Sequence, residues 1–442
     1  MKTTLSYGIE IRNQNKIFLP TVNVYQKALK FCIHVVENEW VDIEPLTAKY
    51  RNAFVEHLVH NTKSNKAKYI EFDTMFHKLP IYLLRDIVSQ SIGVVSSYHS
   101  NLKNWIDSGK GGSAPSLQIN HRKFPTFYKP KMGNTSELSS NKIRLKLFID
   151  NDWKFVDIRL KPTDVKYITK NFDTNIISNP ILEKRYNKWS IRFVVKEDHE
   201  LKTKPISDQT VLSVDLGVNT DATCSVMKSD GTIHARKFIN FHCDKDQIYH
   251  CLNKIKGIQH KYGSKGTNTK KLWRYVKSLN DELARKIANA ITDCAISQNV
   301  DVIVFEHLDS FGRKHGKNKQ RLSMWKKNTI QKIVEQKAHR HGIRVSRICA
   351  WKTSKLAFDG SGIVVRGRDA GFETCELCKF QNGKIYNCDL SASYNIGARY
   401  FLREIQKSIS VTKWSDISAK VPNCQKRTLC TYSTLVEVAK LI

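Results

Sequence analysis

Two short apolar runs, each ending at a single carboxylate, restrict the fold of this chain more than any other feature. VLSVD ends at Asp215, and VDVIVF ends where Glu306 follows. Such runs are typical of strands buried on both faces. Between them, apolar residues recur every three or four positions through 273–294, which predicts an amphipathic helix. A strand, a helix and a second buried strand in this order predict a parallel crossover that carries both carboxylates to the mouth of one sheet.

Three further segments extend this pattern. DATCSVM and TIHARKF read as two strands joined by Ser229-Asp230-Gly231, so Asp215 would end the first strand of a meander. Gly217 lets the backbone turn there, or approach a phosphate closely. Asp389 opens a helical pattern, with the acidic residue in the first turn. The residues expected to pack this helix on the sheet are Ala392, Ile396 and Tyr400. Asp389 would then face the two strand carboxylates.

Three carboxylates in this order are what an RNase H-type nuclease needs as metal ligands. Clustered oxygen ligands suit Mg²⁺, which takes one or two carboxylates per ion. Two ions about 4 Å apart can activate a water and stabilise the leaving 3′ oxygen without a covalent nucleophile. We therefore expect Asp215, Glu306 and Asp389 to be catalytic and to hold two Mg²⁺ ions. The alternative is three unrelated acids at strand ends and a helix cap.

The segments DLGVN, FEHL and CDLSASYNIGAR resemble the three split RuvC motifs of TnpB-type, transposon-encoded RNA-guided nucleases and of the compact type V CRISPR effectors similar to them. The resemblance is specific over about 211–405. It implies that Asp215, Glu306 and Asp389 are the catalytic metal ligands of an RNA-guided DNA endonuclease. Ser391 stands where the family usually has Asn.

Charge independently indicates a polyanionic partner. The chain has 73 Lys and Arg against 41 Asp and Glu, a formal net charge of +32, which favours nucleic acid. A membrane surface is the alternative, but no apolar run is long enough to span and no basic amphipathic anchor is evident. The N-terminus lacks the apolar core of a signal peptide, so we expect a cytoplasmic, nucleoid-associated bacterial protein. Cys32, Cys224 and Cys294 then read as reduced core thiols.

The expected fold class is α+β and multidomain. Periodicity is helical over about 21–108, and GKGGSAPS at 109–116 breaks it. Alternating strands then follow at 142–149, 153–160 and 188–195, after a first strand at LSYGIEI. With the family layout, the expected domains are a wedge β-barrel at 1–20 and 109–205, an inserted helical recognition lobe at 21–108, an RNase H-like α/β RuvC nuclease at 206–351 and 389–410, a small insert at 352–388 and a C-terminal tail at 411–442.

Two basic segments are candidate nucleic-acid contacts. The strands of the N-terminal half interleave basic with aromatic residues: Arg144, Lys146, Phe148, Trp153, Lys154, Phe155, Arg159 and Lys161. Basic groups contact phosphates and aromatics stack on unpaired bases, so a groove for RNA is expected; a solvated sheet face with its aromatics in the core is the alternative. After Glu306, the stretch 311–328 indicates a loop over the nuclease site, with Trp325 starting a helix. Family resemblance would make it a gating lid; a plain surface loop is equally compatible.

The insert lacks the four-cysteine zinc ribbon that the family normally carries. Thr353-Ser354-Lys355 is present, but only one C-x-x-C follows, Cys375 and Cys378, and then a single Cys388. Four ligands are a strong zinc signal and one pair is a weak one. We therefore expect a degenerate zinc site without zinc. The residues expected to hold the insert by packing are Phe372, Leu377, Phe380, Ile385 and Tyr386.

The expected activity is cleavage of target DNA at a single RuvC site after guide RNA pairs with one strand. The partners would be a guide RNA and double-stranded DNA with a short flanking motif, and the protein would be a monomer or dimer without membrane association. One rival is a guided repressor that no longer cuts, which would require loss of a catalytic acid. The other is an unguided RNase H-like nuclease or transposase, which would not need the basic N-terminal half. Transposon-borne and CRISPR-associated contexts both remain open.

Overall fold

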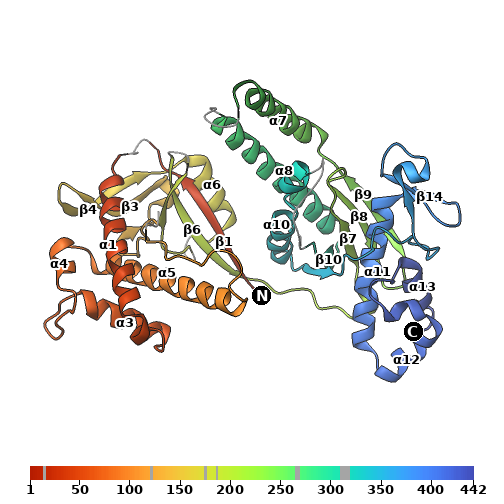
Figure 1. Cartoon of the computed structure of the whole chain (residues 1–442), viewed down its shortest axis with the longest axis horizontal. Helices are drawn as coiled ribbons and strands as arrows, with labels where there is room; N and C mark the ends of the chain where they lie inside the picture. The colour runs from red at the N-terminus through yellow and green to blue at the C-terminus, as the bar shows by residue number, and fades with distance from the viewer. Residues whose placement is uncertain (13–15, 120–122, 174–176, 186–187, 264–268, 309–318) are drawn as a thin grey trace. The chain divides into compact units, whose positions relative to one another are not determined.

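The computed structural model describes residues 1–442 except 13–15, 120–122, 174–176, 186–187, 264–268 and 309–318. The chain forms two compact units. One comprises residues 4–197, and the other comprises residues 1–3 and 198–442. Both units contain helices and sheets, as the α+β prediction requires (Figure 1).

The unit at 4–197 begins with a strand and continues with the predicted run of helices. The strand is β1 (Lys2–Glu10), which begins three residues before the expected segment. The helices are α1 (Leu19–Asn38), α2 (Trp40–Ile43), α3 (Ala48–Val59), α4 (Glu71–Met75) and α5 (Ile81–Asp107). Helix α5 ends directly before the predicted break at 109–116. The long helices α1 and α5 pack together, and the hydroxyl of Tyr25 donates to Asp86 at 2.8 Å between them.

Two three-stranded antiparallel sheets complete this unit. Their strands are β2 (Gly133–Asn134), β3 (Lys142–Ile149), β4 (Asp152–Arg159), β5 (Ile181–Arg185) and β6 (Lys188–Asp198), with α6 (Pro162–Asn171) between β4 and β5. The strand orders are β1-β6-β5 and β2-β3-β4. An isolated bridge between Ile11 and Leu160 joins the two sheets. Apolar residues of both sheets and of α1 to α5 share one core, in which Phe18, Phe127 and Trp189 are fully buried.

The second unit is built on a five-stranded sheet. Its strands are β7 (Val211–Asp215), β8 (Ala222–Met227), β9 (Ile233–Ile239), β10 (Val302–Glu306) and β11 (Arg344–Ile348), in the order β11-β10-β7-β8-β9. Strands β7, β10 and β11 are parallel, whereas β8 and β9 are antiparallel to their neighbours. The predicted meander and parallel crossover are therefore confirmed.

Successive side chains of a strand point to opposite faces of the sheet. Because apolar residues stand on both faces here, helices cover both. On one face, Leu212, Ile303 and Phe305 pack with α8 (Lys270–Ser297) and α10 (Lys327–Arg340). On the other, Val302 and Val304 pack with α11 (Cys388–Ser408). The remaining helices of the unit are α7 (His242–Tyr262), α9 (Lys319–Met324), α12 (Val411–Lys420) and α13 (Tyr432–Ala439). Helix α13 packs on α11, so the C-terminal tail belongs to this core.

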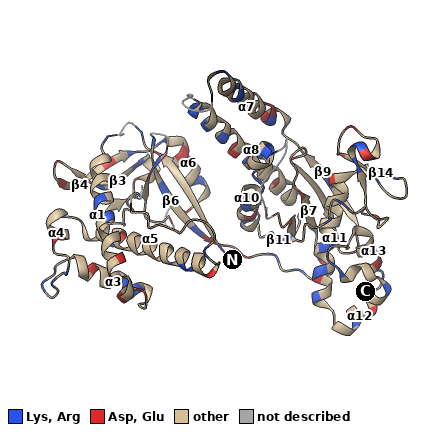
Figure 2. Cartoon of the chain, viewed as in Figure 1, with Lys and Arg blue, Asp and Glu red and all other residues tan. Residues whose placement is uncertain are grey.

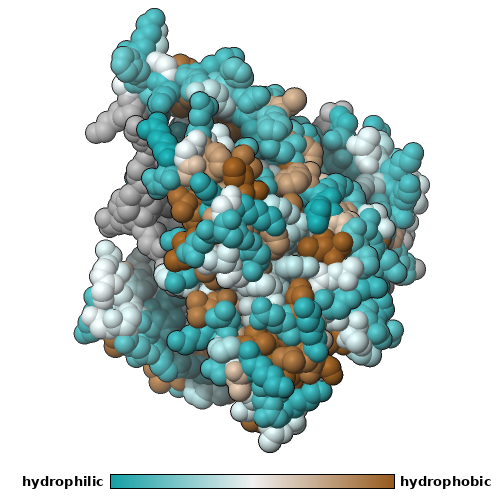
Figure 3. Space-filling model, turned by 90° about the vertical axis from the view of Figure 1, so that its right-hand side faces the viewer, coloured by the Kyte–Doolittle hydropathy of each residue, from teal (hydrophilic) through white to brown (hydrophobic). Residues whose placement is uncertain are grey.

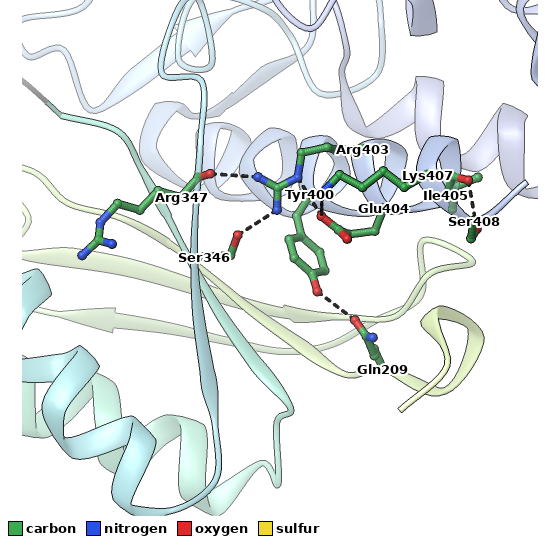
Figure 4. A network of polar contacts seen from close by, with 9 residues as sticks. All are labelled: Gln209, Ser346, Arg347, Tyr400, Arg403, Glu404, Ile405, Lys407 and Ser408. Atoms are coloured by element: carbon green, nitrogen blue, oxygen red, sulfur yellow. Dashed lines mark hydrogen bonds and ion pairs between the residues drawn. The ribbon is translucent and has the colours of Figure 1, made fainter. Parts of the chain in front are cut away.

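Helix α11 lies very close to the sheet. A Cβ on Gly397 would stand 2.5 Å from the sulfur of Met227, so glycine allows this approach. Polar contacts of Tyr400 and Arg403 fix the C-terminal half of α11 (Figure 4). The Tyr400 hydroxyl donates to Gln209 at 2.8 Å, and the Arg403 guanidinium donates to the Arg347 carbonyl at 3.0 Å and to the Ser346 hydroxyl at 2.8 Å. The Arg403 bonds tie the helix to strand β11, and the Tyr400 bond ties it to the segment before β7.

The sequence predicts a loop after β10 and then a helix starting at Trp325. Trp325 does not start a helix, because α9 ends at Met324 and α10 begins at Lys327. Trp325 and Lys326 form the non-helical junction between these two helices. Most of the predicted lid loop, 309–318, lies outside the described residues. No helix in the described part of the chain is long and apolar enough to cross a membrane.

The surface is strongly charged in both units. Lys and Arg residues are distributed along the helices of each unit, with acidic residues interspersed (Figure 2). On the face drawn in Figure 3, hydrophobic residues form small groups separated by hydrophilic ones.

Candidate active site

The structure brings Asp215, Glu306 and Asp389 together. Strands β7 and β10 are adjacent and parallel, with Val214 opposite Phe305, so Asp215 and Glu306 reach the same edge of the sheet. Asp389 lies in the first turn of α11, which packs on β7. The negative charges of Glu306 and Asp389 both act on Asp215, as expected for side chains that face one another.

Helix α11 begins at this edge because Asn387 caps it. The Asn387 side-chain oxygen accepts a hydrogen bond from the Leu390 amide at 2.9 Å, which satisfies a backbone donor of the first turn. Gly217 permits a tight turn directly after β7. A Cβ at that position would lie 2.5 Å from the Thr220 carbonyl oxygen, so a larger residue would have to displace the backbone. The loop therefore stays close to Asp389.

Burial raises the pKa of all three carboxyls above the ordinary value. The pKa of Asp215 lies well above its ordinary value, first because it is buried and then because Glu306 and Asp389 repel its charge. Burial raises the pKa of Glu306, and a hydrogen bond from Thr353 opposes that shift. Burial likewise raises the pKa of Asp389, against a hydrogen bond from Thr220. Without a compensating cation, the ionised form of the cluster is therefore disfavoured.

This donor set suits a hard divalent cation. Three carboxylates at one sheet edge supply the oxygen ligands that Mg²⁺ prefers, and a cation there would relieve their mutual repulsion. As the described side chains stand, no three His, Cys, Asp or Glu residues are already grouped at coordination geometry. The chemistry of the donors fits the metal, while the ligand distances would have to close around it.

A second layer of polar residues holds Glu306. The Thr353 hydroxyl donates to the Glu306 carboxylate, and the Gln331 side chain donates to the Glu306 carbonyl at 3.0 Å. The Asn395 amide donates to the carbonyls of Thr353 at 3.0 Å and Leu356 at 2.9 Å. The motif residue Asn395 thus fixes the segment that carries Thr353.

Arg399 holds the same segment from the next turn of α11. Its guanidinium donates to the carbonyls of Cys349 and Trp351, both at 2.8 Å. It also reaches the C-terminal segment through the carbonyls of Thr428 at 3.2 Å and Cys430 at 3.1 Å. A guanidinium group only donates hydrogen bonds, so these four carbonyl oxygens serve as its acceptors in place of a carboxylate.

Arg366 is a candidate site residue that the sequence patterns did not reveal. Its positive charge opposes the rise in the pKa of both Asp215 and Asp389. Its Nη2 is buried without a hydrogen-bond partner among the described residues. A cavity of about 280 Å³ is lined by Arg366 and Asp389 together with Gly217. A single arginine on a two-residue strand has no periodicity or spacing that could have identified it.

Ser391 is buried, at the position where the resembled family usually has Asn. Its hydroxyl oxygen has no hydrogen-bond partner among the side chains and backbone groups that the structure describes. The departure from the motif therefore leaves a small polar group facing the core at 2% exposure.

The insert differs from its predicted packing. Leu377 and Ile385 are exposed at 41% and 55%, so they do not form its core. Phe372 is half-buried. The predicted residue Phe380 is in the core, with Ala357, Val364, Cys378 and Cys388, and the predicted Tyr386 packs against it together with Phe358. The reason is the short sheet of β12 (Val365–Arg366), β13 (Leu377–Lys379) and β14 (Ile385–Asn387), which turns alternate residues outward.

The three candidate zinc cysteines are in different environments. Cys378 and Cys388 are buried, whereas Cys375 is exposed. The thiols expected in the core are buried and form no disulfide, as predicted; they belong to Cys32, Cys224 and Cys294.

Sequence comparison confirms the resemblance to TnpB-type proteins, because a homologue of this chain carries that name. A TnpB-like protein of Aquifex aeolicus, aq_aa05, is 26% identical over 206 residues, which is 42% of this chain and 65% of the relative, slightly under two thirds of its length. An uncharacterized protein of the same organism, aq_aa04, is 29% identical over 125 residues, 26% of this chain and 69% of the relative. The Aq_aa04 family model matches residues 3–149.

Solved structures align with most of the chain at low similarity. A Cas12f1 complex with guide RNA and target DNA aligns over 90% of this chain and 98% of its own, at 14% identity and a TM-score of 0.34. The C2c1 protein of Alicyclobacillus acidoterrestris with single-guide RNA aligns over 87% and 65%, at 10% identity and a TM-score of 0.45.

Proposed function

We propose that this chain is an RNA-guided DNA endonuclease with one RuvC-like site. The observation that carries the proposal is the meeting of Asp215, Glu306 and Asp389 at the edge of the five-stranded sheet, from two adjacent parallel strands and one helix start. The name of the TnpB-like homologue supports the same activity.

In this proposal the three carboxylates would hold two Mg²⁺ ions. When bound, such ions supply an activated water and neutralise charge at the leaving oxygen of a phosphodiester. Thr353 keeps the Glu306 carboxylate in place, and Arg366 brings a positive charge beside Asp215 and Asp389. Positive charge next to the carboxylates favours the approach of a phosphate, which would otherwise be repelled.

The unit at 4–197 would bind the guide RNA. Its two sheets would belong to the wedge, expected at 1–20 and 109–205, and its helices over 21–108 would form the recognition lobe. On strand pair β3–β4, the Lys146 ammonium lies 5.9 Å from the ring centroid of Phe155, which is 47% exposed. An exposed aromatic beside a cation suits an unpaired base and its phosphate. The insert at 352–388 would handle the target strand, and the net charge of +32 suits both nucleic acids.

The test is cleavage of DNA by the full chain with the RNA that copurifies with it. Asp215→Ala, Glu306→Ala and Asp389→Ala should each lower Mg²⁺-dependent cleavage by several orders of magnitude. Guide-directed binding should change little, because it depends on basic residues elsewhere. Glu437→Gln, an exposed acid on α13, is the matched control and should cut at the wild-type rate. Wild-type cleavage by Asp215→Ala would refute the site.

A further inference from the structure

A second cavity adjoins the carboxylate site. It has a volume of about 340 Å³ and lies between α7, α8 and the junction of α9 with α10. It shares Gly217, Val218 and Arg321 with the cavity that contains Asp389. The two cavities therefore meet at these residues, and a group bound in the second would lie close to Asp389.

The floor of this second cavity is apolar. Its apolar lining residues include Ile248, Leu252, Leu283, Ala284, Ile287 and Ile330. Two aromatic residues also line it, Tyr249, which is 62% exposed, and Trp325. The Nε1 of Trp325 is buried and has no hydrogen-bond acceptor in the described part of the chain. An apolar hollow with an aromatic wall and one spare donor suits a flat ring that carries acceptors.

Polar pairs fix the rim. The Arg321 guanidinium donates to the Asn219 side chain at 2.9 Å, and Lys326 pairs with Asp281 at 2.8 Å. The Asn280 amide donates to the Met324 carbonyl at 2.7 Å, which ties α8 to the end of α9. Because the Asn219 side chain is a neutral amide, this bond leaves the charge of Arg321 to act at the boundary between the two cavities.

We propose that this cavity is a base pocket, which takes one unpaired nucleobase of the DNA strand adjacent to the phosphate at the carboxylates. The inference rests on the proposed nuclease function and adds the form of its substrate. The volume lies near the lower end of the range for small-ligand sites, about 300–1,000 Å³, which fits a nucleoside. Arg321 stands where the backbone between base and scissile phosphate would pass.

A base can enter the pocket only after it leaves the double helix. Unpairing and unstacking cost free energy, and the cost is least for a strand that is already single. Stacking on Tyr249 and burial on the apolar floor would offset it. The pocket thus makes the site selective for a displaced or melted DNA strand over an intact duplex, because a paired base could not occupy it.

The test is binding of single-stranded DNA carrying 2-aminopurine at successive positions, measured with the full chain in EDTA. Quenching should concentrate at one or two adjacent positions, and an abasic site there should weaken binding about tenfold, the size expected for one stacked base. Leu252→Trp fills the pocket and Tyr249→Ala removes its exposed ring, so both should abolish the position dependence. Tyr262→Ala, another exposed tyrosine on α7 outside the pocket, should keep it.

Equal quenching at every position, or position dependence that survives Leu252→Trp and Tyr249→Ala, would overturn the base pocket. Equal quenching with an RNA strand of the same sequence would overturn its assignment to DNA. Because binding is read without Mg²⁺, the result is separate from cleavage. A protein that cuts no DNA with its copurified RNA and Mg²⁺ would refute the nuclease function, whatever the fluorescence shows.

Discussion

The hydroxyl of Thr353 donates a hydrogen bond to the carboxylate of Glu306, although the two residues are 47 positions apart in the chain. Thr353 belongs to the Thr-Ser-Lys segment at the start of the insert, and Glu306 ends the central strand β10. The bond joins the insert directly to the candidate metal ligands.

Loss of that bond should disturb the site more than the fold. Thr353→Val keeps the shape of the side chain and removes the donor, so the Glu306 carboxylate loses a charge-assisted bond worth about 1.5–3 kcal/mol. We expect cleavage to fall about tenfold or more and the Mg²⁺ concentration for half-maximal rate to rise. Thr353→Ser keeps the donor and should retain most activity. Equal kinetics for the Val and Ser variants would show that the bond does not position Glu306.

The net charge of +32 predicts that the protein copurifies with RNA. Each phosphate neutralised on binding releases counterions, so affinity should fall by about 10³ or more between 50 and 200 mM salt if six or more phosphates are contacted. Non-specific binding would show a similar salt dependence. The discriminating measurement is the sequence of the protected RNA: one species with defined ends is expected, and a random mixture would contradict guided activity.

The cysteines of the insert should differ in importance. Cys378 is fully buried and its thiol donates to the Tyr386 carbonyl at 3.4 Å, whereas Cys375 is exposed. Cys378→Ser should cost about 1–2 kcal/mol of unfolding free energy, in the range of modest core changes, and Cys375→Ser almost none. Both variants should still cut DNA. One zinc per chain by elemental analysis, lost together with activity when both residues are replaced, would restore a zinc-ribbon interpretation.

Asp86 should make the stability of the protein depend on pH. It is 3% exposed on α5, and burial raises its pKa against hydrogen bonds from Thr126 and Tyr25. A carboxyl with a raised pKa in the folded state stabilises that state below its unfolded pKa of about 3.9. This contribution is lost as pH rises through the folded pKa.

Replacing Asp86 with Asn removes the titrating group and leaves an acceptor in place. The free energy of unfolding in urea should therefore decline less for Asp86→Asn than for wild type as pH rises from 4 to 7. Asp107→Asn, an exposed position at the end of the same helix, is the control and should follow wild type. Parallel curves for Asp86→Asn and wild type would contradict the assignment.

The strands and helices that carry the three acids were predictable from the sequence because their signals are local. The strands expected in VLSVD and VDVIVF became β7 and β10. The helix expected over 273–294 became part of α8, whose buried residues include Val276, Leu283 and Ile287. An apolar run or a 3.6-residue period reports burial directly, whatever the partner is. The order of these elements then left few topologies for the sheet.

Only the tertiary structure decided which polar residues surround the acids and which apolar residues are truly buried. Asn395 and Arg399 hold the segment of Thr353 through backbone carbonyls 39 to 50 positions away, and Arg366 comes from a two-residue strand of the insert. Leu377 and Ile385 are apolar but exposed, because a three-residue strand turns alternate side chains outward with nothing to cover them. Hydrogen bonds between distant segments leave no period in a sequence, so the base pocket and the support of Glu306 emerge only when the chain is folded.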